Sequence, residues 1–355
     1  MDKYIGFDID CKKTVVCVYQ KNGSSKYDTI GPDIESMKKF LQTEKRDCSG
    51  NVHLVYEVSG QAGFLYDSLV DSVDSLTVAN PSKMTWIFRT SKKNDRIDAY
   101  KMAKLLYMDE MPAVYMPSKE VRQWRETILH RKKTVTKLVK VKNQIRATFK
   151  GQGYNKPQHT GGWWKKSNLL WMRQICQRDM GEFELWHLHL SNLLDEFDLL
   201  KIQIKNTTAY LDRYLATQPG GKLLMSIPGT GPRTAEAVLA YTDDVSRFDN
   251  FKQYCSYFGM VPKLDESGSC RRLGHITKRG PAAVRWVICE SSWMAIRKSK
   301  ALNEFYERVR CGQDGRKKIA IVAVGRKVLS IMRAMLISGE LYNEKLVERM
   351  LKQAA

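Results

Sequence analysis

Four carboxylates in the first hundred residues have the types and spacing that metal-dependent phosphodiester chemistry needs. Asp8 interrupts an apolar predicted strand, where a charge is costly unless it is paired or bound to a cation, and Glu57 ends another strand. Asp95 and Asp98 are three positions apart, so they share one face of a helix. Strand-end carboxylates that converge with a helical pair form the all-oxygen site that Mg²⁺ prefers, and such ions activate oxygens in phosphodiester chemistry.

Each carboxylate also has a structural interpretation. Asp95 could be a helix N-cap, and Asp98 could be a partner for Lys101. Asp10 competes with Asp8, because both residues lie on the same face of the predicted strand; we rank it second. The four residues taken together favour a metal site.

A second candidate site is the segment Ile227–Ala235, which lies between two short apolar helices. Gly229 and Gly231 flank one residue, and a helix start follows, which is typical of a helix-hairpin-helix turn. Backbone N–H groups there can bind a phosphate with the help of the positive end of the helix, and Arg233 adds charge. Such contacts position nucleic acid without reading its sequence. A plain corner between two helices is the alternative.

The third candidate site lies in a polar segment over residues 265–280, which we predict as a loop. Ser267 stands there beside a glycine, and four cationic side chains surround it in the sequence: Arg271, Arg272, Lys278 and Arg279. The serine could attack a phosphate while the cations stabilise charge on the phosphoryl oxygens. On residue types alone, a loop that only contacts phosphate is favoured over a catalytic one.

The charge of the chain favours a nucleic-acid partner. The 355 residues include 59 Lys and Arg against 38 Asp and Glu, a net charge of +21. Residues 1–100 hold fourteen of each sign, so the whole excess lies in residues 101–355. A basic surface of that size is suited to a polyanion. A membrane surface is a weaker alternative, because no basic segment also has an apolar face, and merely solubilising charge is another.

The first hundred residues predict an α/β domain. We expect strands over residues 4–9, 14–19, from 26 onward, 52–57 and 76–79, with helices over 32–41 and 63–72. The Asn-Gly turn at residues 22–23 pairs the second and third strands antiparallel. A hairpin followed by β-α-β units indicates a mixed sheet covered by helices. The eight scattered cysteines, the absence of a long apolar segment and the polar N-terminus indicate a cytosolic protein with reduced thiols.

Two long helices are predicted after this domain. Residues 117–150 hold eleven Lys or Arg and two Glu, which indicates a basic helix. Its expected nucleic-acid contacts are Lys132, Lys133, Lys137, Lys140, Lys142 and Arg146. A turn-rich aromatic stretch follows, and a helix over 183–215 then carries a coiled-coil seam: Leu190, Leu193, Phe197, Leu200 and Ile204. The helices should pair with each other or across a dimer. Short helices are expected thereafter.

Taken in this order, the motifs resemble those of the DEDD-type transposases of bacterial insertion sequences, the bridge-RNA-guided recombinases related to the Piv-type DNA invertases. The matching segments near the N-terminus are residues 5–8, 57–60 and 94–99. Those near the C-terminus are residues 226–231, 258–262, 266–269 and 277–280. Asp10 replaces a small residue of the family pattern, and the pair Trp163-Trp164 has no counterpart, so it either stacks on RNA or packs.

The resemblance implies a RuvC-like (ribonuclease H-type) domain over residues 1–116, a basic and coiled-coil region over 117–218, and a helical transposase domain over 219–355. The metal-binding tetrad would be Asp8, Glu57, Asp95 and Asp98, with Mg²⁺ as the cofactor. Ser267 would be the nucleophile, because it fills the family's Glu-Ser-Gly position. The resemblance alone thereby reverses the preference for a non-catalytic loop.

The implied activity is RNA-guided DNA recombination. Ser267 would attack a phosphodiester and form a covalent phosphoserine link, while a structured bridge RNA encoded by the element pairs with donor and target DNA. The implied assembly is a homo-oligomer, from dimer to tetramer, at the prokaryotic nucleoid in the cytoplasm, with no membrane partner. Three alternatives remain: a RuvC-type junction endonuclease that uses water, a site-specific DNA invertase, and a non-catalytic nucleic-acid scaffold.

Overall fold

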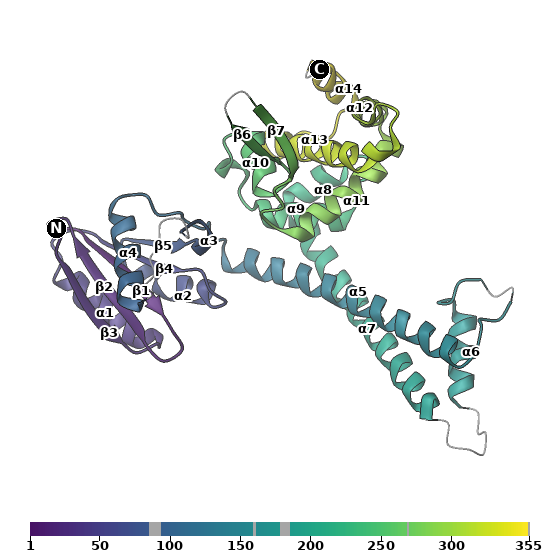
Figure 1. The fold of residues 1–355 in the computed structure, drawn as a ribbon, viewed down its shortest axis with the longest axis horizontal. Helices are drawn as coiled ribbons and strands as arrows, with labels where there is room; N and C mark the ends of the chain where they lie inside the picture. Colours follow the sequence, from purple (N-terminus) through teal and green to yellow (C-terminus); the bar gives the residue numbers. More distant parts are fainter. Residues whose placement is uncertain (85–93, 159–160, 178–184, 268–269, 354–355) are drawn as a thin grey trace. The chain divides into compact units, whose positions relative to one another are not determined.

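The computed structural model describes residues 1–84, 94–158, 161–177, 185–267 and 270–353. The chain forms two compact units, Met1–Arg122 and Gln123–Ala355, which are labelled element by element in Figure 1. Within the described residues, none of the helices combines the length and the apolar character that a membrane crossing requires.

The first unit is built on a five-stranded mixed sheet with the strand order β3-β2-β1-β4-β5. The strands are β1 (Lys3–Ile9), β2 (Thr14–Gln20), β3 (Ser25–Ile30), β4 (Val52–Glu57) and β5 (Ser75–Ala79). Strands β1, β2 and β3 pair antiparallel, and β4 lies parallel to both β1 and β5. The predicted mixed sheet and its antiparallel hairpin are confirmed.

Helices cover both faces of this sheet. Helices α1 (Ile34–Arg46) and α2 (Ala62–Leu69) pack on the face that carries Ile5 and Phe7. Helix α4 (Asp95–Tyr107) packs on the opposite face, where Ala99 contacts the side chains of β2. The short helices η1 (Val70–Ser72) and α3 (Pro81–Met84) complete the described elements of the unit. Alternation along β1 therefore places neighbouring residues on different faces of the sheet.

Two long helices of the second unit form an intramolecular hairpin. They are α5 (Lys119–Gly151), which begins in the first unit, and α7 (Leu185–Thr217); α6 (Lys166–Cys176) packs beside them. Val141, Ile145 and Phe149 of α5 form one buried cluster with residues of α6 and with four of the five seam residues of α7. The predicted seam is therefore used within the chain, and it supplies no argument for a dimer. Helix α6 was not predicted.

The Trp163-Trp164 pair belongs to the same aromatic core. Trp164 stacks on Phe197 with ring centres 5.3 Å apart and planes inclined by 24°. The centres of the Trp163 and Phe149 rings are 5.8 Å apart. Of the two interpretations left open for this pair, the structure supports packing.

The rest of the second unit is helical apart from one β-hairpin. The helices are α8 (Pro219–Met225), α9 (Pro232–Thr242), η2 (Val245–Arg247), α10 (Phe251–Tyr257), α11 (Ala282–Lys298), α12 (Lys300–Arg310), η3 (Asp314–Arg316), α13 (Lys317–Ser338) and α14 (Glu344–Gln353). Strands β6 (Pro262–Ser267) and β7 (Cys270–Ile276) pair antiparallel. The predicted polar loop over residues 265–280 is wrong for most of its length, because the strands occupy it. Helix α13 is longer than the short helices expected.

Candidate functional site

The carboxyl ends of two parallel strands place Asp8 beside Glu57. Phe7 of β1 is the register partner of Tyr56 in β4, and each carboxylate is the next residue of its strand. Gly6 is likewise the partner of Val55, and Val55 packs against Met102 of α4. Because alternate residues share a face, Asp8 and Glu57 both lie on the face that α4 covers.

Gly6 allows α4 to approach the sheet closely. A Cβ atom at Gly6 would lie 2.2 Å from the carbonyl oxygen of Ala99 and 3.0 Å from the backbone nitrogen of Ala103. The helix backbone therefore rests directly on β1. Asp8 follows Gly6 by two residues on the same face, and Asp95 lies one turn before Ala99 at the N-terminus of α4.

The helix that carries the second carboxylate pair begins as its sequence predicts, but with a different cap. The side chain of Asn94 accepts a hydrogen bond from the backbone N–H of Arg96 at 3.0 Å, so Asn94 is the N-cap. The interpretation of Asp95 as the cap is wrong; Asp95 is the first residue of α4, and Asp98 lies in its first turn. Both charges are thus stabilised by the positive end of the helix dipole.

An ammonium group lies among these acids. The Nζ of Lys13 is 2.9 Å from Oδ2 of Asp95. The hydrogen bond to Asp95 and the charge of Asp95 raise the pKa of Lys13, and the charges of Asp10 and Asp8 raise it further. Three acidic side chains therefore act on one cation at this end of the sheet. Sequence patterns did not identify Lys13, because nothing in its spacing marks it.

The carboxylates differ in their surroundings. Asp8 is half-buried, whereas Glu57 and Asp10 are exposed, so the argument that a strand charge is costly applies to Asp8 and not to Glu57. The carboxylate of Asp10 accepts a hydrogen bond from the N–H of Cys11 at 2.6 Å, which lowers its pKa. This local bond is consistent with ranking Asp10 second.

The donor set fits Mg²⁺ chemically, because all four predicted ligands offer carboxylate oxygens from one face of the sheet. Among the described residues, however, no three His, Cys, Asp or Glu side chains are close enough together to hold a metal ion. The backbone thus places all four residues at one end of the sheet, but their described side chains do not converge on a common metal position.

The predicted helix-hairpin-helix turn joins α8 to α9. Gly229 has a φ of +84°, and a Cβ atom there would lie 2.4 Å from the backbone nitrogen of Ala295 in α11, so only glycine fits. Gly231 is the N-cap of α9, and nothing lies within 4 Å of the place where a Cβ atom would be. A surface hollow is lined by the turn together with Met294 and Lys298 of α11. Lys298 is a cation at this site that sequence patterns missed, because it is remote in the chain.

Arg233 forms ion pairs with acids of its own chain. Its guanidinium pairs with Asp212 of α7 and lies 3.0 Å from the carboxylate of Glu236, although that contact is not aligned as a hydrogen bond. Glu236 is only 2% exposed. Its burial raises its pKa to about 7, although the charges of Arg233 and Arg131 lower that pKa. These contacts join α7 to α9, which is a structural role for Arg233.

The hairpin that carries Ser267 is fixed at its base by two glycines. A Cβ atom at Gly259 would lie 2.1 Å from the carbonyl oxygen of Arg279, and one at Gly280 would lie 2.1 Å from that of Tyr257. The N–H of Thr277 donates to the carbonyl of Val261 at 2.8 Å. Two of the family-like segments therefore hold the base of β6 and β7.

Ser267 is the last residue of β6 and the register partner of Cys270. Residues 268–269 and the side chains of Ser267 and Arg271 lie outside what the structure describes. Arg272, Lys278 and Arg279 are exposed, as phosphate contacts require.

The basic helix presents part of its charge to solvent. Lys133, Lys137, Lys140 and Arg146 are exposed. Lys132 and Lys142 are half-buried, with their ammonium groups 5.7 Å from the Trp286 ring centre and 5.3 Å from that of Trp164. These two lysines therefore also stabilise packing.

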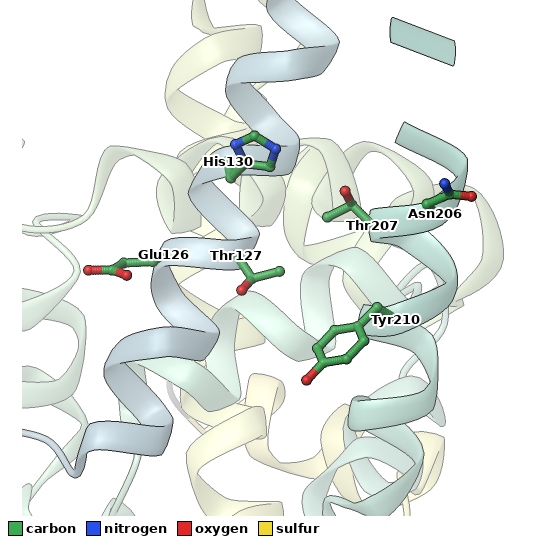
Figure 2. Close-up of a pocket in the computed structure, with 6 residues that line it drawn as sticks. All are labelled: Glu126, Thr127, His130, Asn206, Thr207 and Tyr210. Carbon is green, nitrogen blue, oxygen red and sulfur yellow. The ribbon is translucent and has the colours of Figure 1, made fainter. Parts of the chain in front are cut away.

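A further hollow lies between α5 and α7, where Figure 2 shows its lining. The lining residues are polar: Glu126, Thr127, His130, Asn206, Thr207 and Tyr210. The Thr127 and Thr207 hydroxyls donate to carbonyls of their own helices. None of the sequence motifs includes these residues.

Two family models match successive parts of the chain, and both describe transposases. The DEDD model of IS110 elements, described as "Transposase", matches residues 5–152, and that of the "Transposase IS116/IS110/IS902 family" matches residues 221–307. The chain belongs to the IS110 family of insertion-sequence transposases. Its mixed sheet and helical C-terminal part are compatible with the RuvC-like DEDD architecture.

Individual relatives are similar at low identity. The chain is 23% identical over 255 residues to the transposase for insertion sequence element IS1111A of Coxiella burnetii, covering 71% of this chain and 69% of the relative. It is 28% identical over 163 residues to the pilin gene-inverting protein of Moraxella lacunata, covering 45% and 48%. It is 25% identical over 138 residues to the 43.6 kDa protein of insertion element IS110 from Streptomyces coelicolor, covering 39% and 34%. That relative and two others are matched over only 32–39% of their own length.

Proposed function

We propose that this chain is an RNA-guided DNA recombinase that moves an insertion sequence by serine attack on a phosphodiester. The observation that carries the proposal is the alignment of Asp8, Glu57, Asp95 and Asp98 on one face and one end of the sheet. Family membership supports the DNA substrate, and the excess positive charge supports a polyanionic one.

In this proposal the tetrad holds Mg²⁺, which stabilises negative charge on phosphate oxygens when it is bound. Asp95 and Asp98 lie in the first turn of α4, and Asp8 and Glu57 approach the same space from the strand ends. Lys13 holds Asp95 in place at 2.9 Å and neutralises part of the acidic charge.

Ser267 supplies the nucleophile. Its Oγ forms a bond to phosphorus and loses its proton, while the bond from phosphorus to one sugar oxygen breaks and that oxygen takes up a proton. The phosphoserine ester conserves the energy of the phosphodiester, so a sugar hydroxyl of the other strand can reverse the reaction and rejoin DNA without ATP. Exposed Arg272, Lys278 and Arg279 would hold the phosphate backbone near the hairpin.

A structured RNA encoded by the element would select the DNA by base pairing. The turn at Gly229 and the exposed lysines of α5 offer backbone contacts, which position nucleic acid without reading bases. The RNA would thus read the sequence and the protein would bind backbones, which is consistent with candidate contacts made of cationic side chains and backbone amides. Recombination of two duplexes needs at least two active sites, so we propose a dimer or tetramer.

The test compares two variants on a DNA substrate with Mg²⁺ and the RNA transcribed beside the gene. Ser267→Ala and Asp8→Asn should each abolish strand cleavage and the covalent protein–DNA product, whereas Lys83→Gln, a change in the same unit as Asp8, should retain both. If Ser267→Ala still cleaves, water is the nucleophile and the protein is a junction endonuclease. If Asp8→Asn alters nothing, the scaffold alternative holds.

A DNA invertase is the second candidate, favoured by the likeness to the pilin gene-inverting protein. It would use the same tetrad and Ser267 without a guide RNA. Omitting the RNA from the cleavage reaction separates the two: the proposal predicts loss of cleavage, and the invertase alternative predicts that cleavage persists.

A further inference from the structure

The charged side chains of helix α13 are all positive. Its 22 residues include five Lys or Arg and no Asp or Glu. Lys317 at its start pairs with Asp314 at 2.9 Å, and Arg333 donates to the backbone carbonyls of Phe248 and Asp249. Arg326 and Lys327 lie between these residues and are half-buried.

A third cation joins this pair from α12. The Nζ of Lys327 is 5.7 Å from the centre of the Phe305 ring, and the guanidinium carbon of Arg308 is 5.3 Å from the same centre. The Nη2 of Arg308 donates to the carbonyl of Leu351 in α14 at 3.1 Å, which fixes its position. We name Arg308, Arg326 and Lys327 the α12–α13 cation cluster.

No acid balances the cluster in the part of the chain that the structure describes. The carboxylates of α12 form ion pairs with other cations: Glu304 lies 3.9 Å from the Nζ of Lys300, and Glu307 lies 3.2 Å from the Nε of Arg310. No ion pair includes a member of the cluster, and the buried Nε of Arg326 has no hydrogen-bond partner among the described residues. Burial and then the charges of Arg308 and Arg326 lower the pKa of Lys327.

Arg308 is exposed, whereas Arg326 and Lys327 are half-buried. Half-buried like charges destabilise a fold unless an anion binds beside them. Lys300, Arg310 and Lys317 of this region have carboxylate partners, so the cluster differs from these cations. Guanidinium and ammonium donors match the acceptor oxygens of a phosphate. We propose that the α12–α13 cation cluster binds a phosphate of a nucleic-acid backbone. The class of ligand rests on the proposed function.

Matched charge variants of the full-length protein test this proposal. Lys327→Gln and Arg308→Gln remove one charge each from the cluster, and Lys300→Gln removes one from a lysine of α12 that is paired with Glu304. Binding to a DNA duplex and to a single-stranded RNA of the same sequence is measured across a series of NaCl concentrations. Each cluster variant should reduce the steepness of log K against log salt by about 0.9 for the duplex or about 0.7 for the single strand. Lys300→Gln should leave it unchanged.

The two probes distinguish the source of the phosphate. A smaller slope with DNA alone assigns the cluster to DNA, and a smaller slope with RNA alone assigns it to RNA. Slopes equal to that of Lys300→Gln with both probes would overturn the proposal. Thermal unfolding verifies folding of each variant, and Lys327→Gln should melt no lower than the wild type, because repulsion is relieved. Binding is measured without cleavage, so this result and that of the Ser267→Ala test are independent.

Discussion

At the residue scale, the position of α4 depends on the absence of a side chain at Gly6. A Cβ atom at Gly6 would lie only 2.2 Å from the carbonyl oxygen of Ala99. Because Gly6 has no side chain, α4 lies against β1, and Asp95 and Asp98 lie near the strand of Asp8. The sequence places the four carboxylates on predicted strand ends and a helix start. The sequence does not show that Gly6, two residues before Asp8, determines how closely α4 brings its carboxylates to β1.

We therefore predict that Gly6→Ala separates α4 from β1. Overpacking of this kind costs about 1–3 kcal/mol of unfolding free energy, and the displaced helix should also weaken Mg²⁺ binding. Gly60→Ala is the control, because nothing lies within 4 Å of a Cβ atom there. Urea unfolding and calorimetric Mg²⁺ titration measure the two effects. Equal stability of the two variants would show that the close contact does not determine the position of α4.

Glu236 is a buried acid with a measurable consequence for stability. Its pKa of about 7 lies above the ordinary value of 4.5, because burial outweighs the charges of Arg233 and Arg131, and Asp212 adds repulsion. The folded state thus holds this proton more tightly than the unfolded state. Its contribution to stability is fully present below pH 4.5 and is lost as the pH rises to about 7.

We predict that Glu236→Gln flattens this dependence. The melting temperature of the wild type should fall between pH 5 and pH 7.5 relative to that of the variant, because the variant has no carboxyl group to ionise. Calorimetric melts at matched ionic strength measure the difference. A difference between the two proteins that is the same at every pH would refute the raised pKa.

At the element scale, the periodicity of α7 predicted a helix and its apolar seam, but it left the partner open. The structure fills that seam with α5 and α6 of the same chain, and Phe197 is 2% exposed. Spacing alone cannot distinguish an internal partner from a second copy, because both bury the same residues. The β-hairpin of β6 and β7 was missed because its sequence is polar and its register shifts between Pro262 and Leu264.

We predict that Phe197→Ala destabilises the second unit by about 3–5 kcal/mol, as expected for the loss of a buried ring. Leu199→Ala, which is 55% exposed on the same helix, should change stability little. Denaturant unfolding at two protein concentrations measures both. A midpoint for Phe197→Ala that depends on concentration would indicate a seam between subunits.

At the scale of the whole molecule, the sequence was sufficient for the mixed sheet, the two long helices and the uneven charge, because each follows from local periodicity or composition. The α12–α13 cation cluster and the hollow that Lys298 lines together with the Gly229 turn could not be predicted in this way. Both join residues that are remote in the chain, so only folding brings them together.

The central claim is that acids of the first unit and a hydroxyl of the second act on one phosphodiester. The most direct measurement is mass spectrometry of the protein after reaction with DNA, Mg²⁺ and the adjacent transcript. The account predicts a nucleotide joined through phosphate to Ser267 in the wild type, and none in Asp8→Asn. A modified residue other than Ser267, or an unchanged yield in Asp8→Asn, would contradict it.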